Sequence, residues 1–332
     1  MSRKRKLTKK QKEQRNRGLF GFFIVFLIFL VGYAVGRKDI TMQEIKEKLY
    51  QISARIEAQI DNIDLPHSSG NQTLENTTQI HILDVGQGSS ILFISRDGTS
   101  VLVDTGRYDD SEKRIISYLD SYIGLGQELD LLIFTHNDAD HIGHGDLVLD
   151  YFDVQEVWMN GMDHTTVLYS KVLDAVLASD AKYLEPKMGD VFKRGPFELR
   201  VLHPKEDSNQ RNQNAESIVT HITFDGFSFM TSGDASFSEE FEIVKKYGDI
   251  QADMMLLGHH GAADSTSDIW LNAVNPELAF YQAGVGNTYG HPRPETIERV
   301  TEADIPVYGT DELGTISIFV DKDGVIQVET EK

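Results

Sequence analysis

Hydrophobic and polar residues alternate over short runs near the start of the folded part of the chain. Residues 79–85, 90–95 and 99–104 have the two-residue periodicity of strands, and the Arg-Asp-Gly segment at 96–98 is typical of a hairpin turn. We therefore predict that the folded domain begins at residue 79 with three strands.

Strand-like and helix-like runs alternate along the rest of the chain. Apolar positions three or four residues apart predict helices, and short apolar runs rich in β-branched residues predict strands. The predicted helices cover residues 111–123, 146–152, 165–178, 237–247, 266–273 and 294–302; the predicted strands cover 129–134, 154–157, 197–202, 217–224, 227–231, 252–257, 278–281, 315–320 and 325–329. The two similar halves favour a layered α/β sandwich over a barrel.

The N-terminal segment has a different pattern. Residues 18–36 contain no charged side chain and are long enough to cross a bilayer as a helix. We predict an uncleaved anchor, with a cleaved secretion signal as the alternative. Nine basic residues and one acidic residue in the tail 1–17 place the N-terminus in the cytoplasm, so the rest of the chain is expected to be extracellular.

Between the anchor and the domain, residues 41–63 are predicted to form a juxtamembrane helix. Its apolar positions are three or four residues apart, which is close to a heptad repeat. The alternatives are a coiled coil that joins copies of the chain into a homo-oligomer, and a helix that lies on the domain or on the membrane surface. Residues 64–78 are rich in Pro, Ser, Gly, Asn and Thr and are predicted to be a linker to the domain at 79–332.

Charge and cysteine content limit the chemistry. The net charge is −20, and after the first 36 residues the 23 basic and 51 acidic residues leave −28. Such a body repels polyanions, so long DNA is a doubtful partner unless a local basic patch or bound metal ions overcome the field. The absence of cysteine excludes thiolate metal ligands and cysteine nucleophiles.

Four metal-ligand side chains follow the predicted strand at 129–134. These are His136, Asp138, Asp140 and His141. Imidazole and carboxylate together suit zinc, manganese or iron, and four such groups in six residues exceed what one tetrahedral ion needs from one segment. The segment therefore predicts a pair of divalent ions, zinc first and manganese or iron as alternatives, each completed by ligands from elsewhere in the chain.

The order of these motifs resembles that of the metallo-β-lactamase superfamily. The matching segments are Asp84 after the first strand, the His-x-Asp-x-Asp-His run, Gly233-Asp234 and His259. More narrowly, the segments at 83–88, 138–143, 259–261 and 289–292 resemble the hydrolase domain of ComEC-type DNA-uptake competence proteins. The resemblance covers residues 79–329 and implies a four-layer αββα sandwich that acts as a metal-dependent hydrolase.

The resemblance also implies a role for each residue of the motifs. His136 and Asp138 would hold the first ion; Asp140, His141 and His259 would hold the second; Asp234 would bridge both; and Asp84 would accept hydrogen bonds that fix the ligand loop. Relatives supply a further histidine to the first ion, before the strand that precedes the bridging aspartate. This chain has no histidine there, and Asn214 or His203 is the candidate to replace it.

Further residues are candidates for catalysis. Asp140 or Asp234 would orient or deprotonate the attacking water, and His291 would contact a phosphoryl oxygen or protonate the leaving group. Gln87, in a glycine-rich turn, is a candidate substrate contact, and His260 a candidate residue around the ligands.

Three functional hypotheses follow. The first is a membrane-anchored, extracellular phosphodiesterase or nuclease that uses a metal-activated water. Its substrate would be a nucleic acid, a phosphate-containing envelope polymer or a small phosphodiester. The second is a lactone, thioester or β-lactam hydrolase on the same fold, because a fold does not determine its substrate. The third is a non-catalytic, anchored metal-binding module.

Overall fold

The computed structural model describes residues 77–206 and 212–332. The expected cytoplasmic tail at 1–17, transmembrane helix at 18–36, juxtamembrane helix at 41–63 and nearly all of the linker at 64–78 lie outside these residues. Thr78, assigned to the linker from the sequence, is the first residue of a strand. In the part of the chain that is described, no helix combines the length and the apolar character needed to cross a membrane.

The described residues form two large mixed sheets and a small two-stranded one. Adjacent strands of the first sheet are, in order, β17 (Ile326–Thr330), β16 (Ile316–Val320), β1 (Thr78–Ile82), β2 (Ile91–Ile94), β3 (Ser100–Val103), β5 (Leu131–Ile133), β7 (Glu156–Trp158) and β8 (Lys182–Leu184). The second sheet has the order β15 (Val307–Gly309), β14 (Leu278–Tyr281), β13 (Met254–Leu256), β12 (Phe227–Thr231), β11 (Val219–Phe224), β10 (Phe197–His203) and β9 (Val191–Arg194). Strands β4 (Glu128–Leu129) and β6 (Asp153–Val154) form the small sheet.

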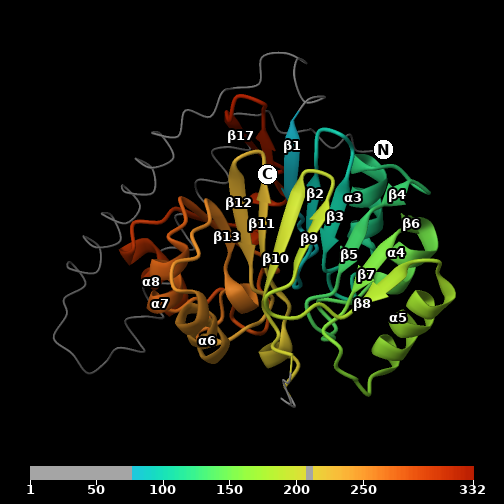
Figure 1. Ribbon diagram of the computed structural model, residues 1–332, viewed down its shortest axis with the longest axis horizontal. Coiled ribbons are helices and arrows are strands. Elements are labelled where there is room, and N and C mark those ends of the chain that lie inside the picture. Colours follow the sequence, from blue (N-terminus) through green and yellow to red (C-terminus); the bar gives the residue numbers. More distant parts are fainter. Residues whose placement is uncertain (1–76, 207–211) are drawn as a thin grey trace, which may run out of the picture. The chain divides into compact units, whose positions relative to one another are not determined.

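Helices cover the outer faces of the two large sheets. α3 (Arg114–Tyr122), α4 (Gly145–Tyr151) and α5 (Val167–Ala178) lie on one side of the domain, and α6 (Phe237–Tyr247), α7 (Asp268–Val274) and α8 (Pro294–Glu302) lie on the other (Figure 1). The short helix α9 (Thr310–Leu313) and the 3-10 turns η2 (Asn214–Glu216) and η3 (Gly258–Gly261) complete the elements. The chain therefore has the four-layer αββα arrangement that the resemblance implied.

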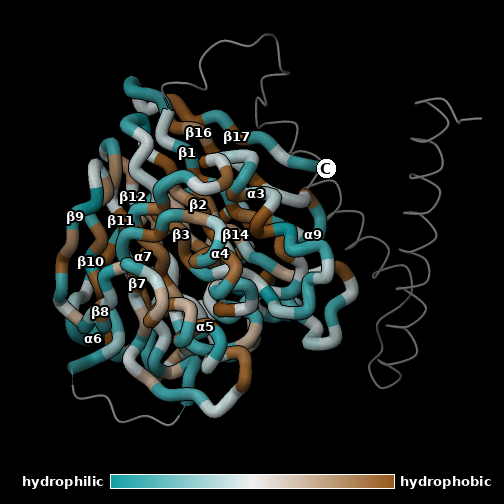
Figure 2. Tube along the Cα trace, turned by 90° about the vertical axis from the view of Figure 1, so that its right-hand side faces the viewer, coloured by the Kyte–Doolittle hydropathy of each residue, from teal (hydrophilic) through white to brown (hydrophobic). Residues whose placement is uncertain are grey.

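Three hydrophobic clusters hold these layers together. In β2, Ile91 and Phe93 point into the cluster between the two sheets, whereas Leu92 points into the cluster under α3, α4 and α5. A third cluster, which includes Trp270, lies between the second sheet and its helices. Strands that are buried on both faces read as continuous apolar runs, which is why brown segments follow the strands in Figure 2.

Several short elements differ from the sequence-based expectation. The expected strand at 129–134 divides into β4 and β5, and the one at 154–157 is replaced by β6 and β7. Strands β8 and β9 were missed because they are largely exposed sheet edges with polar or charged side chains, which lack a clear hydrophobic periodicity. Strand β15 and helix α9 were missed because they span three and four residues.

Parallel strands bring the motifs to one end of the sandwich. β12 and β13 pair in parallel, with Met230 opposite Met255, so the loops that follow both strands leave the sheet at the same edge. β5 ends at Ile133, three residues before the first predicted ligand, His136. A hydrogen bond from Ile218 N to Thr135 O at 2.8 Å joins the loop after β5 to the start of β11, and so connects the two sheets at this edge.

Candidate metal centre

The ligand run folds into a tight turn after β5. The backbone N–H groups of His141 and Ile142 both donate to Asp138 O, at 3.0 and 3.1 Å. This turn places His136 and His141 with ring centroids 4.0 Å apart, and both rings are buried. The apolar strand before the turn fixes where the run begins, and the turn directs its polar side chains to one side.

A buried carboxylate outside the predicted motifs holds this turn. Asp104 Oδ2 lies 2.7 Å from His141 Nδ1, and Asp104 also accepts hydrogen bonds from the backbone and hydroxyl of Thr135. Because Nδ1 is occupied, Nε2 is the nitrogen of His141 that is free for a ligand. Burial alone would lower the pKa of His141, but the carboxylates of Asp234 and Asp104 raise it well above the usual value.

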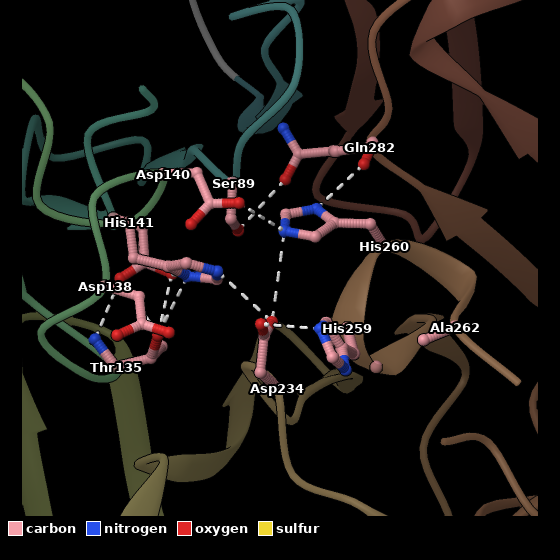
Figure 3. A network of polar contacts seen from close by, with 12 residues as sticks. Ser89, Thr135, Asp138, Asp140, His141, Asp234, His259, His260, Ala262 and Gln282 are labelled. Atoms are coloured by element: carbon pink, nitrogen blue, oxygen red, sulfur yellow. Dashed lines mark hydrogen bonds and ion pairs between the residues drawn. The ribbon is translucent and has the colours of Figure 1, made fainter. Parts of the chain in front are cut away.

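Asp234 lies at the middle of the cluster (Figure 3). Its backbone N–H donates to Ser217 Oγ at 3.1 Å, and its Oδ1 lies 3.2 Å from His141 Nε2. Its Oδ2 lies 3.4 Å from His259 Nε2 and 3.7 Å from His136 Nε2. Burial opposes ionisation, but the surrounding histidines hold the pKa of Asp234 well below the usual range.

Two consecutive histidines follow β13 in a left-handed backbone conformation. His259 has φ 50° and His260 has φ 56°. Residues other than glycine rarely adopt this backbone conformation, and those that do are concentrated at functional sites. His260 Nδ1 pairs with Gln282 O at 2.9 Å, and its Nε2 lies 3.5 Å from Asp140 Oδ2. His259 Nδ1 lies 3.6 Å from Asp264 Oδ1.

The buried polar atoms at the centre fit a cation. Nε2 of His136, His141 and His260 and Oδ1 of Asp234 are buried, and apart from ion-pair contacts with one another and with nearby carboxylates they make no hydrogen bond within the described residues. Two groups of residues can each offer a set of ligand atoms that all lie within 4.8 Å of one another. These groups are His136/His141/Asp234 and Asp140/His141/His260. Unpartnered buried imidazole and carboxylate atoms are costly unless something satisfies them, and this donor set is that of a divalent metal.

The structure differs from the prediction in which of two adjacent histidines joins the ligand groups. His260, expected only around the ligands, belongs to the second group, whereas His259 belongs to neither group and lies against Asp234. Asp138 lies beside the first group, with Oδ2 3.7 Å from His136 Nε2. The two histidines are adjacent in sequence, so spacing alone did not distinguish them.

Asp84 does not have the expected role. Its carboxylate accepts from Gly86 N at 3.2 Å, from Arg114 Nη1 at 3.1 Å and from Lys332 Nζ at 3.1 Å. The carboxylate that fixes the ligand loop is that of Asp104, which the sequence identified only as the end of a strand. The signal that was available is its position directly after a buried strand, in the segment Asp104-Thr105-Gly106.

The other candidates are near the centre or turned away from it. The ring of His291 lies 5.4 Å from that of His259 and 6.2 Å from that of His260, and its buried Nδ1 has no partner among the described residues. Gln87 Oε1 accepts from Gly284 N at 3.1 Å. Asn214 is half-buried in η2, and His203 is buried with Nδ1 3.0 Å from Ser217 O.

The chain matches a known protein family. Residues 83–284, more than half of the chain, match the family model described as the metallo-beta-lactamase superfamily. The chain belongs to this superfamily. Its fold and its His and Asp clusters are those of a metal-dependent, hydrolase-like protein.

The curated relatives narrow the family assignment within the superfamily. ComE operon protein 3 of Bacillus subtilis (strain 168) is 30% identical over 260 residues, which are 73% of this chain and 33% of the relative. Competence protein ComA of Neisseria gonorrhoeae is 28% identical over 255 residues, 76% of this chain and 33% of the relative. Recombination protein 2 of Haemophilus influenzae is 26% identical over 265 residues, 78% of this chain and 31% of the relative. The chain thus spans about a third of the length of these relatives, and the resemblance to ComEC-type competence proteins is confirmed.

Proposed function

We propose that the chain is a membrane-anchored hydrolase that cleaves phosphodiesters outside the cell with a metal-activated water. The observation that carries the proposal is the convergence of buried Nε2 atoms from His136, His141 and His260, which make no hydrogen bond among the described residues, on the carboxylate of Asp234. These atoms come from the loops after β5, β12 and β13, so the fold itself assembles them.

The donor set is suited to two divalent ions, zinc in the first place and manganese or iron as alternatives. His136 and Asp138 would hold one ion, and Asp140, His141 and His260 the other, with Asp234 between them. Ions bound there supply a water of lowered pKa and a Lewis acid for the scissile group. Asp104 keeps Nε2 of His141 directed at the centre, and Asp140 and Asp234 provide carboxylate oxygens that orient a water.

Residues at the edge of the centre favour an anionic substrate. Arg107 Nη1 donates to the hydroxyl of Tyr289 at 3.1 Å, and its guanidinium lies 5.7 Å from the centroid of that ring. Although partial burial opposes it, hydrogen bonding to Tyr289 and nearby carboxylates, among them Asp140, raise the pKa of Arg107. A planar guanidinium recognises phosphate oxygens, and Tyr289, which is 46% exposed, presents a ring for stacking.

A hollow next to these residues gives a substrate room to bind. The open cavity has a volume of about 530 Å³ and is lined by Val85, Gln87, Arg107, Asp109, Asp110, Ser111, Glu112 and Arg114. Gln87 and Arg107 are the members that we propose contact the substrate. His291, whose buried Nδ1 has no hydrogen-bond partner within 77–206 and 212–332, is proposed to contact a phosphoryl oxygen or the leaving group.

The location is proposed from the sequence. Residues 18–36 would anchor the chain, and the basic residues in 1–17 would keep its N-terminus in the cytoplasm, leaving the hydrolase domain outside. Protease added to intact cells is expected to remove an epitope placed after Lys332 and to spare one placed before residue 18. The opposite pattern would overturn this orientation.

A substrate panel tests the proposed activity. Full-length protein purified in detergent is loaded with zinc or manganese and mixed with bis(p-nitrophenyl) phosphate, single-stranded DNA, a phosphate-containing wall polymer, nitrocefin and a lactone. We expect metal-dependent cleavage of at least one phosphodiester and no hydrolysis of nitrocefin or the lactone. Cleavage only of the last two would replace the phosphodiesterase proposal by the alternative hydrolase.

Arg107 gives a sharper form of the same test. Arg107→Ala is expected to raise KM for an anionic phosphodiester roughly tenfold, about 1.4 kcal/mol, with a small change in kcat, because the contact is made with bound substrate. Arg200→Ala is the matched control, since the guanidinium of Arg200 in β10 lies 4.5 Å from the ring centroid of Tyr247 in α6. Equal effects of the two variants would exclude a substrate-binding role for Arg107.

A further inference from the structure

We propose that Gln282, which directly follows β14, is a positioning residue that holds the two sides of the second metal position together. The proposal rests on the metal centre described under the proposed function and deepens it. In this second position, Asp140 and His141 come from the loop after β5 in the first sheet, and His260 comes from the loop after β13 in the second sheet. Gln282 bonds both to His260 and to the loop between β1 and β2 (Figure 3).

The backbone carbonyl of Gln282 fixes the ring of His260. His260 Nδ1 lies 2.9 Å from Gln282 O, and both residues are buried. A carbonyl oxygen can only accept a hydrogen bond, so in the neutral ring Nδ1 carries the proton and Nε2 keeps its lone pair. Nε2 lies 3.5 Å from Asp140 Oδ2. The contact with Gln282 therefore gives His260 the tautomer that a metal ligand needs at Nε2.

The side-chain amide of Gln282 fixes the loop between β1 and β2. Its Oε1 accepts from Ser90 N at 3.1 Å and from Ser89 Oγ at 3.3 Å. Its Nε2 donates to Leu83 O at 2.8 Å and to Ser90 O at 2.7 Å. A backbone N–H is always a donor and a carbonyl always an acceptor, so these partners determine which end of the amide is which. All the hydrogen-bonding capacity of this buried amide is used.

The same loop lies against the backbone of Asp140. Ser89 N donates to Asp140 O at 3.0 Å. A Cβ added at Gly88 would lie 2.7 Å from Asp140 O, so the loop passes directly beside the ligand run. Gln282 therefore acts on His260 directly and on Asp140 through the backbone of Ser89. Displacing the loop is expected to move these two ligands relative to one another.

The hydrogen bonds require a glutamine side chain. Glutamate has the same length but would place a carboxylate oxygen against Leu83 O and Ser90 O, where two donors are needed. Asparagine has the amide but is one methylene shorter. Methionine has a similar length but removes the partner of Ser90 N and of Leu83 O, and buried backbone groups that lose their partners are costly.

Zinc titration of the full-length protein tests the assignment without using activity. His260→Ala identifies the equivalent of Zn²⁺ that belongs to the second position, as the one whose affinity it lowers. Gln282→Met is expected to weaken that equivalent about 10–100-fold and to leave the other unchanged. Gln155→Met is the matched control, because the amide of Gln155 makes an exposed hydrogen bond to Asp153 O and its loss should leave zinc binding unchanged.

A double-mutant cycle separates positioning from a general loss of stability. When His260→Ala has removed the ring, adding Gln282→Met should have little further effect on zinc affinity, because no second side is left to align. Added to Asp138→Ala, which removes a ligand of the first position, it should still weaken the second position about 10–100-fold. Equal losses at both equivalents in Gln282→Met, or wild-type affinity at both, would overturn the assignment.

Gln282→Asn decides the question if the methionine variant does not fold. It keeps an amide, but its shorter side chain cannot make all four bonds. Thermal unfolding of the metal-free variants shows which of them are folded before metal is added. A folded Gln282→Asn that loses affinity at the second position alone supports the assignment, and one that binds zinc as wild type does overturns it.

The outcomes separate this inference from the proposed function. Wild type that binds no divalent ion overturns both. Wild type that binds zinc but cleaves no phosphodiester overturns only the proposed activity, and the zinc affinities of the variants then still decide the role of Gln282. Metal-dependent cleavage by wild type, together with unchanged zinc affinity in Gln282→Met, overturns only the inference.

Discussion

At the residue scale, the metal centre depends on which nitrogen of each histidine faces it. Nδ1 of His141 is held by Asp104 at 2.7 Å, Nδ1 of His260 pairs with Gln282 O at 2.9 Å, and Nδ1 of His136 lies 3.2 Å from the neighbouring threonine hydroxyl. In all three rings Nε2 is therefore left for the centre. Partners of this kind fix both the tautomer and the orientation of a ligand before any ion arrives.

Asp104→Asn tests this pre-orientation. The asparagine keeps an acceptor for Thr135 and tolerates the left-handed backbone at φ 60°, but it removes the charge opposite His141. Zinc affinity is expected to fall about 10–100-fold, while the metal-free variant unfolds close to the wild-type temperature. Competition with a chelator measures the affinity, and a value within twofold of wild type would contradict the role given to Asp104.

Glu240 supplies a residue-scale prediction away from the centre. Its carboxylate accepts from the backbone of Thr266 and of Ser267 at the start of α7, and burial raises its pKa to about 7 despite these hydrogen bonds. A raised folded-state pKa favours the protonated group in the folded chain. The stability that this contributes is complete below the unfolded value near 4.5 and is lost as pH rises through 7.

Glu240→Gln isolates this effect. The unfolding free energy of wild type minus that of the variant is expected to fall by up to about 3 kcal/mol as the pH is raised from about 4.5 to above 7. Denaturant unfolding at a series of pH values measures it. A difference that stays constant would show that Glu240 ionises as it does in the unfolded chain, and a difference that rises with pH would show that folding lowers its pKa; either would contradict the prediction.

At the element scale, the turn after β5 is held by backbone packing. Gly143 N donates to Gly106 O at 2.9 Å, and a Cβ added at Gly143 would lie 2.3 Å from Gly106 O and from Tyr108 N. These are backbone atoms, which cannot swing aside as a side chain can. The loop after β3 and the loop after β5 therefore fit together only with glycine at position 143.

Gly143→Ala should move the whole ligand turn. We expect a loss of about 1–3 kcal/mol in unfolding free energy from overpacking, together with weaker zinc binding because His141 lies two residues away. Gly98→Ala is the control: it adds a methyl group in open space at φ +91° and should cost stability without changing zinc affinity. Equal zinc affinity in both variants would show that the turn tolerates displacement.

The elements were predictable where hydrophobic periodicity was strong. The sequence located β1, β2 and β3 to within a few residues, since their apolar side chains fill cores on both faces of the sheet. It missed β8 and β9 because polar edge strands acquire their structure from a neighbouring strand rather than from their own pattern.

The site was predictable where ligands are close together in sequence. His136, Asp138, Asp140 and His141 lie within six residues, so the run was visible without a structure. Asp104 was missed because its proximity to that run is created by the parallel pairing of β3 and β5. Local sequence carries no record of this contact.

At the scale of the whole molecule, the net charge disfavours a polyanionic substrate, whereas the proposed metal centre favours an anionic one. The net charge of −20 repels a polyanion, yet Arg107 and the proposed cations offer local positive charge at the edge of one acidic cavity. Binding of a nucleic acid is therefore expected to depend on loaded metal more than on the surface field, which favours short or flexible phosphodiesters over long duplex DNA.

The most direct test of the account is the rate of phosphodiester cleavage as metal is restored to metal-free protein. Wild type should gain activity towards bis(p-nitrophenyl) phosphate in proportion to bound Zn²⁺ or Mn²⁺, whereas Asp234→Asn should be at least about 100-fold slower at saturation. Activity that is present without metal, or that is unaffected by loss of the Asp234 carboxylate, would contradict it.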